Sequence, residues 1–325
     1  MKFRTGIPLS PTEPYLTYEQ SILSLGSCFA DEIGAKLAYH KFDIQVNPLG
    51  ISYNPFSLQK LLNWLMAKEE LLAPVFQKSR NRWHSFDLHS SFSFQTKEKL
   101  LQELEEKRNS LHVYLQEAEL LILTFGTARA YRLKSSGDWI ANNYGYPSSH
   151  FEKACLGLEL MEEKMRSCIE SLHKFNPKLN ILLTLSPIRH VRDGLVENAE
   201  SKALLRILIH KLSEKYRQIS YFPAYEIMMD DLRDYRFYKA DLIHPNEQAQ
   251  TYIWEALIQR HIQPETQQLL SMAASIQRDL SHKAFQADSQ EHQAFLQRLL
   301  KKIEDLPPEI DFSSEKQALK EKLSI

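Results

Sequence analysis

The hydrophobic pattern of the chain up to residue 225 alternates between short apolar runs and longer amphipathic segments. The apolar runs span residues 21–25, 42–46, 120–125, 180–185 and 218–223. Most of them are continuously apolar, which is typical of strands covered by helices on both faces. Helical periodicity marks residues 29–40, 57–70, 96–118, 151–174, 196–217 and, after the last run, 246–260. This alternation predicts an α/β fold in which right-handed βαβ crossovers build a parallel sheet.

Two regions depart from the alternation. Residues 77–95 are aromatic and polar without a clear period, and we expect them to form an excursion over the edge of the sheet. From residue 261 the chain becomes rich in Gln, Lys and Leu, with a helical period. We therefore predict one domain over residues 1–260 and a C-terminal helical extension over residues 261–325. Its two or three helices are expected to pack on the main domain or on another subunit.

Composition narrows the functional classes. The 325 residues carry a formal net charge of -1, so no bulk electrostatic attraction to nucleic acid or to an anionic membrane is expected. No apolar run approaches the roughly 18 to 20 residues of a membrane-spanning helix, and the first residues lack the apolar core of a signal peptide. The three cysteines, Cys28, Cys155 and Cys168, indicate neither a disulfide framework nor a CxxC metal site. We expect a cytoplasmic protein without a metal ion or cofactor.

The first candidate for chemistry is the stretch SILSLGSCFADEIGAKL, residues 21–37. Gly26 follows an apolar run and permits a sharp bend, after which acidic residues begin a helix. Ser27 or Cys28 would lie at this junction, near unpaired helix N–H groups that lower the pKa of a thiol and stabilise an oxyanion. The alternative interpretation is structural: Ser27 caps the helix and Cys28 packs as a small hydrophobic residue.

The second candidate is KADLIHPNEQAQTYIWEAL, which follows the last apolar run. Pro245 keeps His244 out of a regular helix, and Asn246 is suited to cap the helix that follows. Asp241 lies three residues before His244, so in a turn its carboxylate can accept the imidazole Nδ1–H and orient the ring. The alternative is that Asp241 caps a turn and His244 is an ordinary surface residue.

Together the two patterns resemble the SGNH (GDSL-like) hydrolase superfamily, and GSCFA at residues 26–30 resembles the name-giving motif of the GSCFA family within it. Similar to the rest of that family's signature are NPLGISYNP, LTFGTARAYR, LSPIRHVRDGLVENAESKALL and FPAYEIMMDDLRDYRFYKADLIHPN. The resemblance covers about residues 20–258. It implies a three-layer α/β/α sandwich whose five parallel strands have the order 2-1-3-4-5, with a central first strand.

The resemblance also implies roles for single residues. Residues 26–28, Gly-Ser-Cys, would form the nucleophile block, and Gly50 would offer its backbone N–H to an oxyanion. Asp241 and His244 would form the last block of the family's pattern. In Gly-Asp-Ser the nucleophilic serine stands two residues after the glycine, and Cys28 holds that place here.

The third block departs from the superfamily pattern. It usually reads Gly-x-Asn-Asp, whereas this chain has Gly-Thr-Ala-Arg, beginning at Gly126. The asparagine that would complete the oxyanion hole is absent, and we expect Thr127, Asn54 or a backbone amide to replace it. His190 follows the fourth apolar run and is a further candidate for lining the site.

The sequence therefore favours Cys28 as the attacking residue, with Ser27 as the alternative nucleophile. The helix N-terminus and an imidazolium at His244 are expected to lower the pKa of the Cys28 thiol. The function implied is that of an acyl esterase that hydrolyses a small-molecule or glycan ester, or a thioester, through a covalent acyl intermediate. Acyl transfer to a sugar hydroxyl and an inactive binding module are the alternatives. The oligomeric state cannot be read from the sequence.

Overall fold

The computed structural model describes residues 5–67, 76–79, 81–143, 145–282 and 289–323. Its centre is a five-stranded parallel sheet with the spatial order β10-β9-β5-β1-β2. The strands are β1 (Ser21–Gly26), β2 (Asp43–Val46), β5 (Leu120–Phe125), β9 (Asn180–Leu185) and β10 (Ile219–Phe222). Counted along the chain, this is the predicted order 2-1-3-4-5, and β1 lies inside the sheet between β2 and β5.

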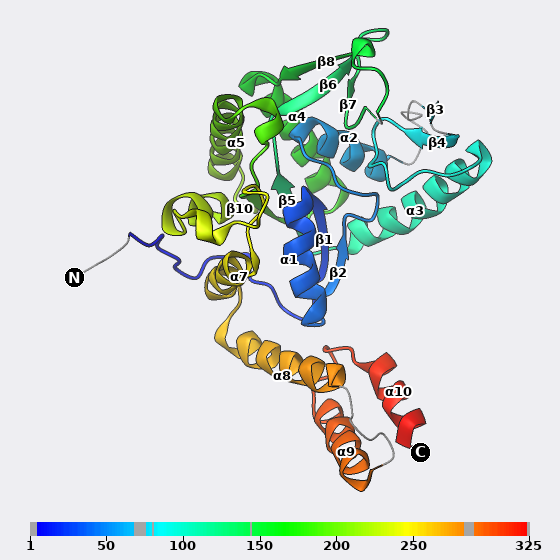
Figure 1. Cartoon of the computed structure of the whole chain (residues 1–325), viewed down its shortest axis with the longest axis vertical. Coiled ribbons are helices and arrows are strands. Elements are labelled where there is room, and N and C mark those ends of the chain that lie inside the picture. Colours follow the sequence, from blue (N-terminus) through cyan, green and yellow to red (C-terminus); the bar gives the residue numbers. More distant parts are fainter. Residues whose placement is uncertain (1–4, 68–75, 80, 144, 283–288, 324–325) are drawn as a thin grey trace.

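Each face of the sheet has its own hydrophobic core, because successive side chains of a strand point to opposite faces. Leu23 and Leu25 of β1 pack in one core and Ile22 packs in the other. The first face is covered by α2 (Pro55–Met66), α3 (Lys97–Glu117), α4 (Leu158–Phe175) and α5 (Leu195–Lys215), and the second by α1 (Cys28–Tyr39) and α7 (Glu247–His261). The predicted three-layer α/β/α sandwich is confirmed (Figure 1).

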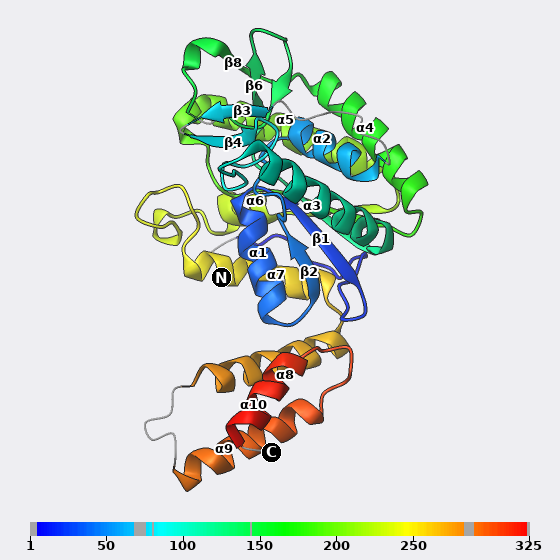
Figure 2. The same cartoon turned by 90° about the vertical axis from the view of Figure 1, so that its right-hand side faces the viewer.

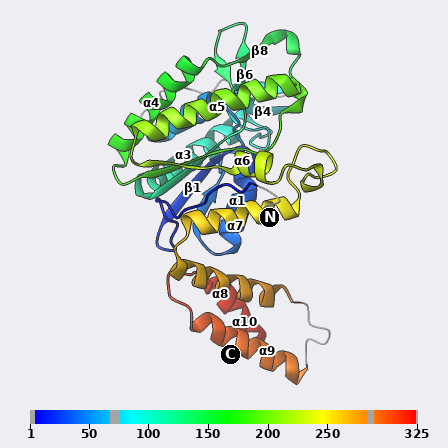
Figure 3. The ribbon, with the colours of Figure 1, turned by 90° about the vertical axis from the view of Figure 1, so that its left-hand side faces the viewer.

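Three further helices follow the sandwich. They are α8 (Pro264–Ser281), α9 (Gln290–Glu304) and α10 (Ser313–Leu323). Figures 1 and 2 show them as a separate group below the sheet, and Figure 3 shows α8 leading away from the end of α7. The group contacts the main domain at Lys41, which forms an ion pair with Glu315 and lies 4.7 Å from the centre of the Phe312 ring.

The helix predicted over residues 151–174 is wrong in its first part. Residues Phe151–Cys155 form β8, which pairs antiparallel with β6 (Arg129–Leu133), and β6 also pairs with β7 (Trp139–Ile140). The helix begins only after Gly157. Strand β8 exists because a partner some twenty residues earlier in the chain hydrogen-bonds to it, and local periodicity carries no information about such a partner.

The predicted excursion over residues 77–95 contains a hairpin of β3 (Phe76–Ser79) and β4 (Arg82–Ser85). The helix expected over 57–70 begins earlier, at Pro55, behind the capping residue Asn54, and residues 68–70 lie outside the described part of the chain. None of the helices in the described ranges combines the length and the apolar character that crossing a bilayer requires.

Between β10 and α7 the chain makes three short turns: α6 (Ala224–Glu226), a π-helical turn (Ile227–Asp231) and a 3₁₀ turn (Tyr235–Phe237). This segment returns the chain to the carboxyl end of the sheet, where parallel α/β folds place their sites.

Candidate active site

The turn after β1 requires glycine at its first position. Gly26 has φ +149°, and a Cβ there would lie 2.3 Å from the carbonyl oxygen of Thr124 on the neighbouring strand β5. The next residue, Ser27, donates its backbone N–H to the same carbonyl at 3.1 Å. The turn is therefore pressed against β5, which fixes the point where α1 begins.

Ser27 serves as the cap of α1. Its side chain accepts a hydrogen bond from the backbone N–H of Phe29 at 3.3 Å, and only 1% of the residue is exposed. Its backbone carbonyl accepts the N–H of Ala30. The buried Ser27 hydroxyl therefore provides a partner for a backbone N–H that has no acceptor within the first turn of the helix.

Cys28 is the first residue of α1 and faces the Asp241–His244 turn. The distance from Cys28 Sγ to His244 Nε2 is 3.9 Å, and His244 Nδ1 lies 2.7 Å from a carboxylate oxygen of Asp241. Because the Asp241 carboxylate is ionised and only accepts, Nδ1 carries the proton and Nε2 presents its lone pair to the thiol. The contact expected between Asp241 and His244 is present, and three side chains from two distant parts of the sequence form one chain of polar contacts.

Asp241 also shapes the turn that carries His244. One carboxylate oxygen accepts the backbone N–H groups of Ile243 at 2.9 Å and of His244 at 3.0 Å. These two bonds, together with the bond from the His244 ring, hold the pKa of the Asp241 carboxyl well below its ordinary range. The carboxylate therefore stays charged at neutral pH, and its hydrogen bond to Nδ1 orients the imidazole.

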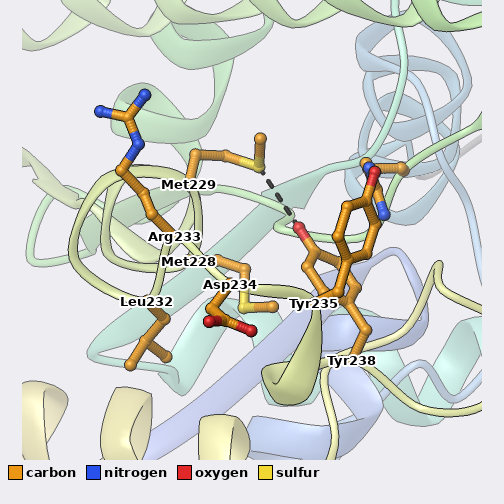
Figure 4. A pocket seen from close by; sticks show the side chains of 8 residues that line it. Met228, Met229, Leu232, Arg233, Asp234, Tyr235 and Tyr238 are labelled. Carbon is orange, nitrogen blue, oxygen red and sulfur yellow. Dashed lines mark hydrogen bonds between the residues drawn. The ribbon is translucent and has the colours of Figure 1, made fainter.

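Arg189, from the loop after β9, contacts the Asp241–His244 turn and the segment before it. Its guanidinium lies 4.4 Å from the centre of the Tyr238 ring and 5.3 Å from that of Tyr235, and it donates to the carbonyl oxygen of Leu242. Leu242 has φ +57°, a left-handed conformation that is unfavourable for a residue with a side chain. Arg189 also lines a pocket of about 230 Å³ beside the turn. Met228 and Met229 of the π-helical turn line the same pocket (Figure 4).

The expected lowering of the Cys28 thiol's pKa is not found. Burial, followed by the carboxylate of Glu32 one helical turn later, raises the pKa of the Cys28 thiol to about 11. The backbone amide of Cys28 and the ammonium of Lys202 act in the opposite direction but do not outweigh these two. Glu32 is itself half-buried, and burial raises the pKa of its carboxyl. At neutral pH Cys28 is therefore a thiol, and it needs a base to attack.

The backbone amides expected to bind an oxyanion are already in use. The N–H of Gly50 donates to the carbonyl oxygen of Asn47 at 2.7 Å, and the N–H groups of Gly126 and Thr127 both donate to the carbonyl oxygen of Tyr53. The amide of Cys28, at the N-terminus of α1, lies beside its own sulfur. Among these backbone N–H groups, that of Cys28 is the one that lowers the pKa of the thiol.

The side chains expected to replace the missing asparagine have structural roles. Asn54 caps α2 by accepting the N–H of Ser57 at 2.9 Å. The hydroxyl of Thr127 lies 3.1 Å from that of Ser201 on α5, and it accepts the N–H of Arg129. Both side chains are therefore engaged in hydrogen bonds that stabilise local structure.

His190 lies close to Gly126, beside the turn that carries Ser27 and Cys28. A Cβ on Gly126 would lie 3.2 Å from both His190 Nε2 and Ser27 Cβ, so the absence of a side chain at Gly126 lets the ring approach the turn. The ring packs edge-on against Tyr53, with centres 5.5 Å apart. Burial, followed by the ammonium of Lys202, lowers the pKa of His190 to about 4, so the imidazole is neutral at pH 7.

Lys202 is a residue near the site that the sequence did not predict. It lies on α5, fully buried, and its Nζ donates to the carbonyl oxygens of Gly126 and Ser186 at 2.7 Å each. A signal was available, because Lys202 falls on the helical repeat of residues 198, 201, 205, 208, 209 and 212, all of which are buried. A lysine on the buried face of a helix indicates a specific partner.

The described residues contain no group of three or more His, Cys, Asp or Glu side chains placed to hold a metal ion. The polar contacts at the end of β1 join a thiol, an imidazole and a carboxylate.

Comparison with known proteins identifies the family of the chain. Residues 21–257 match the GSCFA family, and residues 273–325 match the family described as GSCFA domain protein, C-terminal domain. No curated protein matches the chain. The first match covers the whole sheet and both halves of the site, from the turn at Gly26 to the helix after His244. The chain belongs to the GSCFA family.

Proposed function

We propose that this protein is a thiol acyl hydrolase of the SGNH type, which cleaves an ester or thioester through an acyl intermediate on Cys28. The single observation that carries the proposal is the line of contacts from Cys28 Sγ to His244 Nε2 and from His244 Nδ1 to Asp241. It reproduces the relation of nucleophile, base and orienting acid that defines hydrolytic triads on unrelated folds. The strand order and the placement of the nucleophile after β1 support the relation to SGNH hydrolases.

The raised pKa of the Cys28 thiol determines how the first step proceeds. His244 Nε2 takes the proton from the thiol as sulfur attacks the acyl carbonyl carbon, so no stable thiolate is needed beforehand. Asp241 stabilises the imidazolium that forms. The imidazolium then protonates the leaving alcohol or thiol, and the C–O or C–S bond to the leaving group breaks. His244 next deprotonates water, which attacks the thioester and releases the acid and the free thiol.

In this proposal the oxyanion is held by the amide of Cys28 and by the ring of His190. The neutral state of His190 suits this task, because a neutral imidazole donates a hydrogen bond without adding a full charge. Its position over Gly126, next to the nucleophile turn, supports the assignment. The substrate proposed is a small-molecule or glycan acyl ester, and a nucleophilic free thiol suits a reducing compartment such as the cytoplasm.

A second candidate, a binding module that has lost the reaction, has specific support. The thiol is protonated at neutral pH, and the amides of Gly50, Gly126 and Thr127 are hydrogen-bonded within the protein. We favour the enzyme because a binding module gains nothing from an ionised Asp241 that orients an exposed imidazole toward a thiol.

A panel of substrates distinguishes the two. We expect turnover of short-chain p-nitrophenyl esters or of N-acetylcysteamine thioesters by the wild type, and loss of that turnover in Cys28→Ala and in His244→Ala. A monosaccharide added as acceptor tests transfer, since acylated sugar would appear in place of free acid. Equal background rates for the wild type and both variants on every substrate would establish the binding module.

A further inference from the structure

A buried ammonium lies directly behind the site. Lys202 is 1% exposed, and its two hydrogen bonds of 2.7 Å go to the carbonyls of Gly126 and Ser186. Gly126 is the first residue after β5 and Ser186 the first after β9. The lysine therefore joins the carboxyl ends of two neighbouring strands, at the edge of the sheet where the nucleophile turn lies.

Stability alone does not explain this side chain. Within the described ranges no carboxylate forms an ion pair with Lys202, and the other group near its Nζ is the Tyr225 ring, whose centre is 5.7 Å away. Burial lowers the pKa of Lys202 to about 7, which shows how unfavourable the environment is for a charge. The two hydrogen bonds stabilise the strand ends, but an uncharged donor such as a glutamine amide could supply one of them without the cost of burying a charge.

The charge of Lys202 acts on the reacting groups. Its ammonium lowers the pKa of the Cys28 thiol, and it is among the causes that keep His190 neutral. Through Gly126 it also fixes the residue over which the His190 ring lies. The ionisable groups that face it are therefore the thiol, the imidazole and the phenol of Tyr225, and none of them is an acid that neutralises it at pH 7.

We propose that Lys202 is a positioning residue of the Cys28 site, which fixes the strand ends around Gly126 and stabilises negative charge as it develops on the Cys28 sulfur. This inference rests on the proposed function, because it assigns the buried charge to the step in which the thiol loses its proton. Lys202 does not touch the substrate in this account. It acts through the carbonyl of Gly126 and through its electric field.

The test compares Lys202→Met with Lys211→Met, in which an exposed lysine of the same helix is replaced. Alkylation of Cys28 by iodoacetamide is followed by mass spectrometry from pH 6 to pH 10 in the folded protein, and thermal unfolding is recorded for each variant. In Lys202→Met we expect the labelling of Cys28 to be about threefold slower at pH 6, where Lys202 of the wild type carries its charge, and the difference to narrow above pH 7 as that lysine loses its proton. The melting temperature should fall, because two buried carbonyl oxygens lose their hydrogen-bond donor. Lys211→Met should match the wild type in both measurements.

Lys202→Gln serves as the second variant, because its amide still donates to one carbonyl but carries no charge. It should show the same slower labelling at pH 6, with a smaller loss of stability than Lys202→Met. An unchanged profile in both variants would overturn the inference while leaving the proposed function intact. If Cys28→Ala turns over short-chain p-nitrophenyl esters and thioesters as fast as the wild type, the proposed function itself fails, so the two failures are distinguishable.

Discussion

Ser27→Ala separates the two candidate nucleophiles by their effects on folding and on chemistry. The Ser27 hydroxyl caps α1 by accepting the N–H of Phe29, and it is 1% exposed. Loss of a serine cap costs about 1 kcal/mol, within a range of about 0.5 to 2. The N–H of Phe29 is left without its acceptor in a buried place, which moves the expected value toward about 1 to 2 kcal/mol. For a chain of this size that corresponds to a fall in melting temperature of about 2 to 4 °C per kcal/mol.

The chemistry should survive this change. We expect Ser27→Ala to retain acyl turnover and the alkylation of Cys28, with a lower midpoint in urea. Cys28→Ala is the matched variant: it should unfold close to the wild-type midpoint and lose turnover entirely. The reasoning is refuted if Ser27→Ala abolishes turnover while its unfolding curve is unchanged. That result would identify serine as the nucleophile and would show that the helix cap does not contribute to the free energy of unfolding.

Three further predictions concern electrostatics and positioning. Glu32→Gln should lower the pKa of the Cys28 thiol, because the Glu32 carboxylate raises it. The expected readout is faster alkylation of Cys28 at pH 7.5, and slower alkylation would contradict this effect of Glu32. Arg189→Met should reduce kcat at least tenfold with little change in KM, because the Asp241–His244 turn loses the hydrogen bond that Arg189 donates to Leu242. Arg233 lines the same pocket, and Arg233→Met should leave kcat unchanged. Equal losses in both variants would refute the role of Arg189 in holding the turn. Burial lowers the pKa of His261 to about 4 from an ordinary 6.5. Between these two values the unfolded chain binds a proton that the folded chain does not. The free energy of unfolding should therefore fall by up to about 3 kcal/mol as the pH drops from about 6.5 to about 4. Urea midpoints at pH 7 and pH 4.5 measure this, and His261→Gln should show a smaller difference than the wild type.

The sheet could be predicted from the sequence because its strands are buried on both faces. Five continuously apolar runs separated by helical segments leave few alternatives to a parallel α/β sheet. The smaller antiparallel sheet could not be predicted in the same way. Its strand β8 alternates poorly and depends on pairing with β6, so the segment was assigned to the helix that follows it. Local periodicity reports on the faces of an element and not on its distant partners.

The polar pairs of the site were predictable, but the state of each group was not. The spacing of Asp241 and His244 in a turn before a capped helix predicts their hydrogen bond, because three residues suffice to bring the carboxylate to the ring. The thiol's pKa depends on burial and on Glu32, and the engagement of Gly50 depends on Asn47. Such effects follow from three-dimensional packing, in which a helix N-terminus is only one contribution among several.

The close contact between Gly26 and the Thr124 carbonyl could be predicted only in part. A glycine after a buried strand predicts a bend or a close approach, and the approach found is the Thr124 carbonyl on β5. The partner could not be read from the sequence, because it depends on which strand lies beside β1. Once the strand order is fixed, the need for glycine follows from the distance alone.

The central claim is that Cys28 carries the acyl group, and covalent trapping tests it most directly. The wild type is mixed with p-nitrophenyl acetate, quenched in acid within seconds, digested, and mapped by mass spectrometry, with Cys28→Ser and His244→Ala treated in parallel. The account predicts a burst of p-nitrophenol and an acetyl group on the peptide that contains residues 26–30, located on the Cys28 sulfur and absent from His244→Ala. An acetyl group on Ser27, or release of p-nitrophenol in a burst with no acetyl group on either residue, would contradict it.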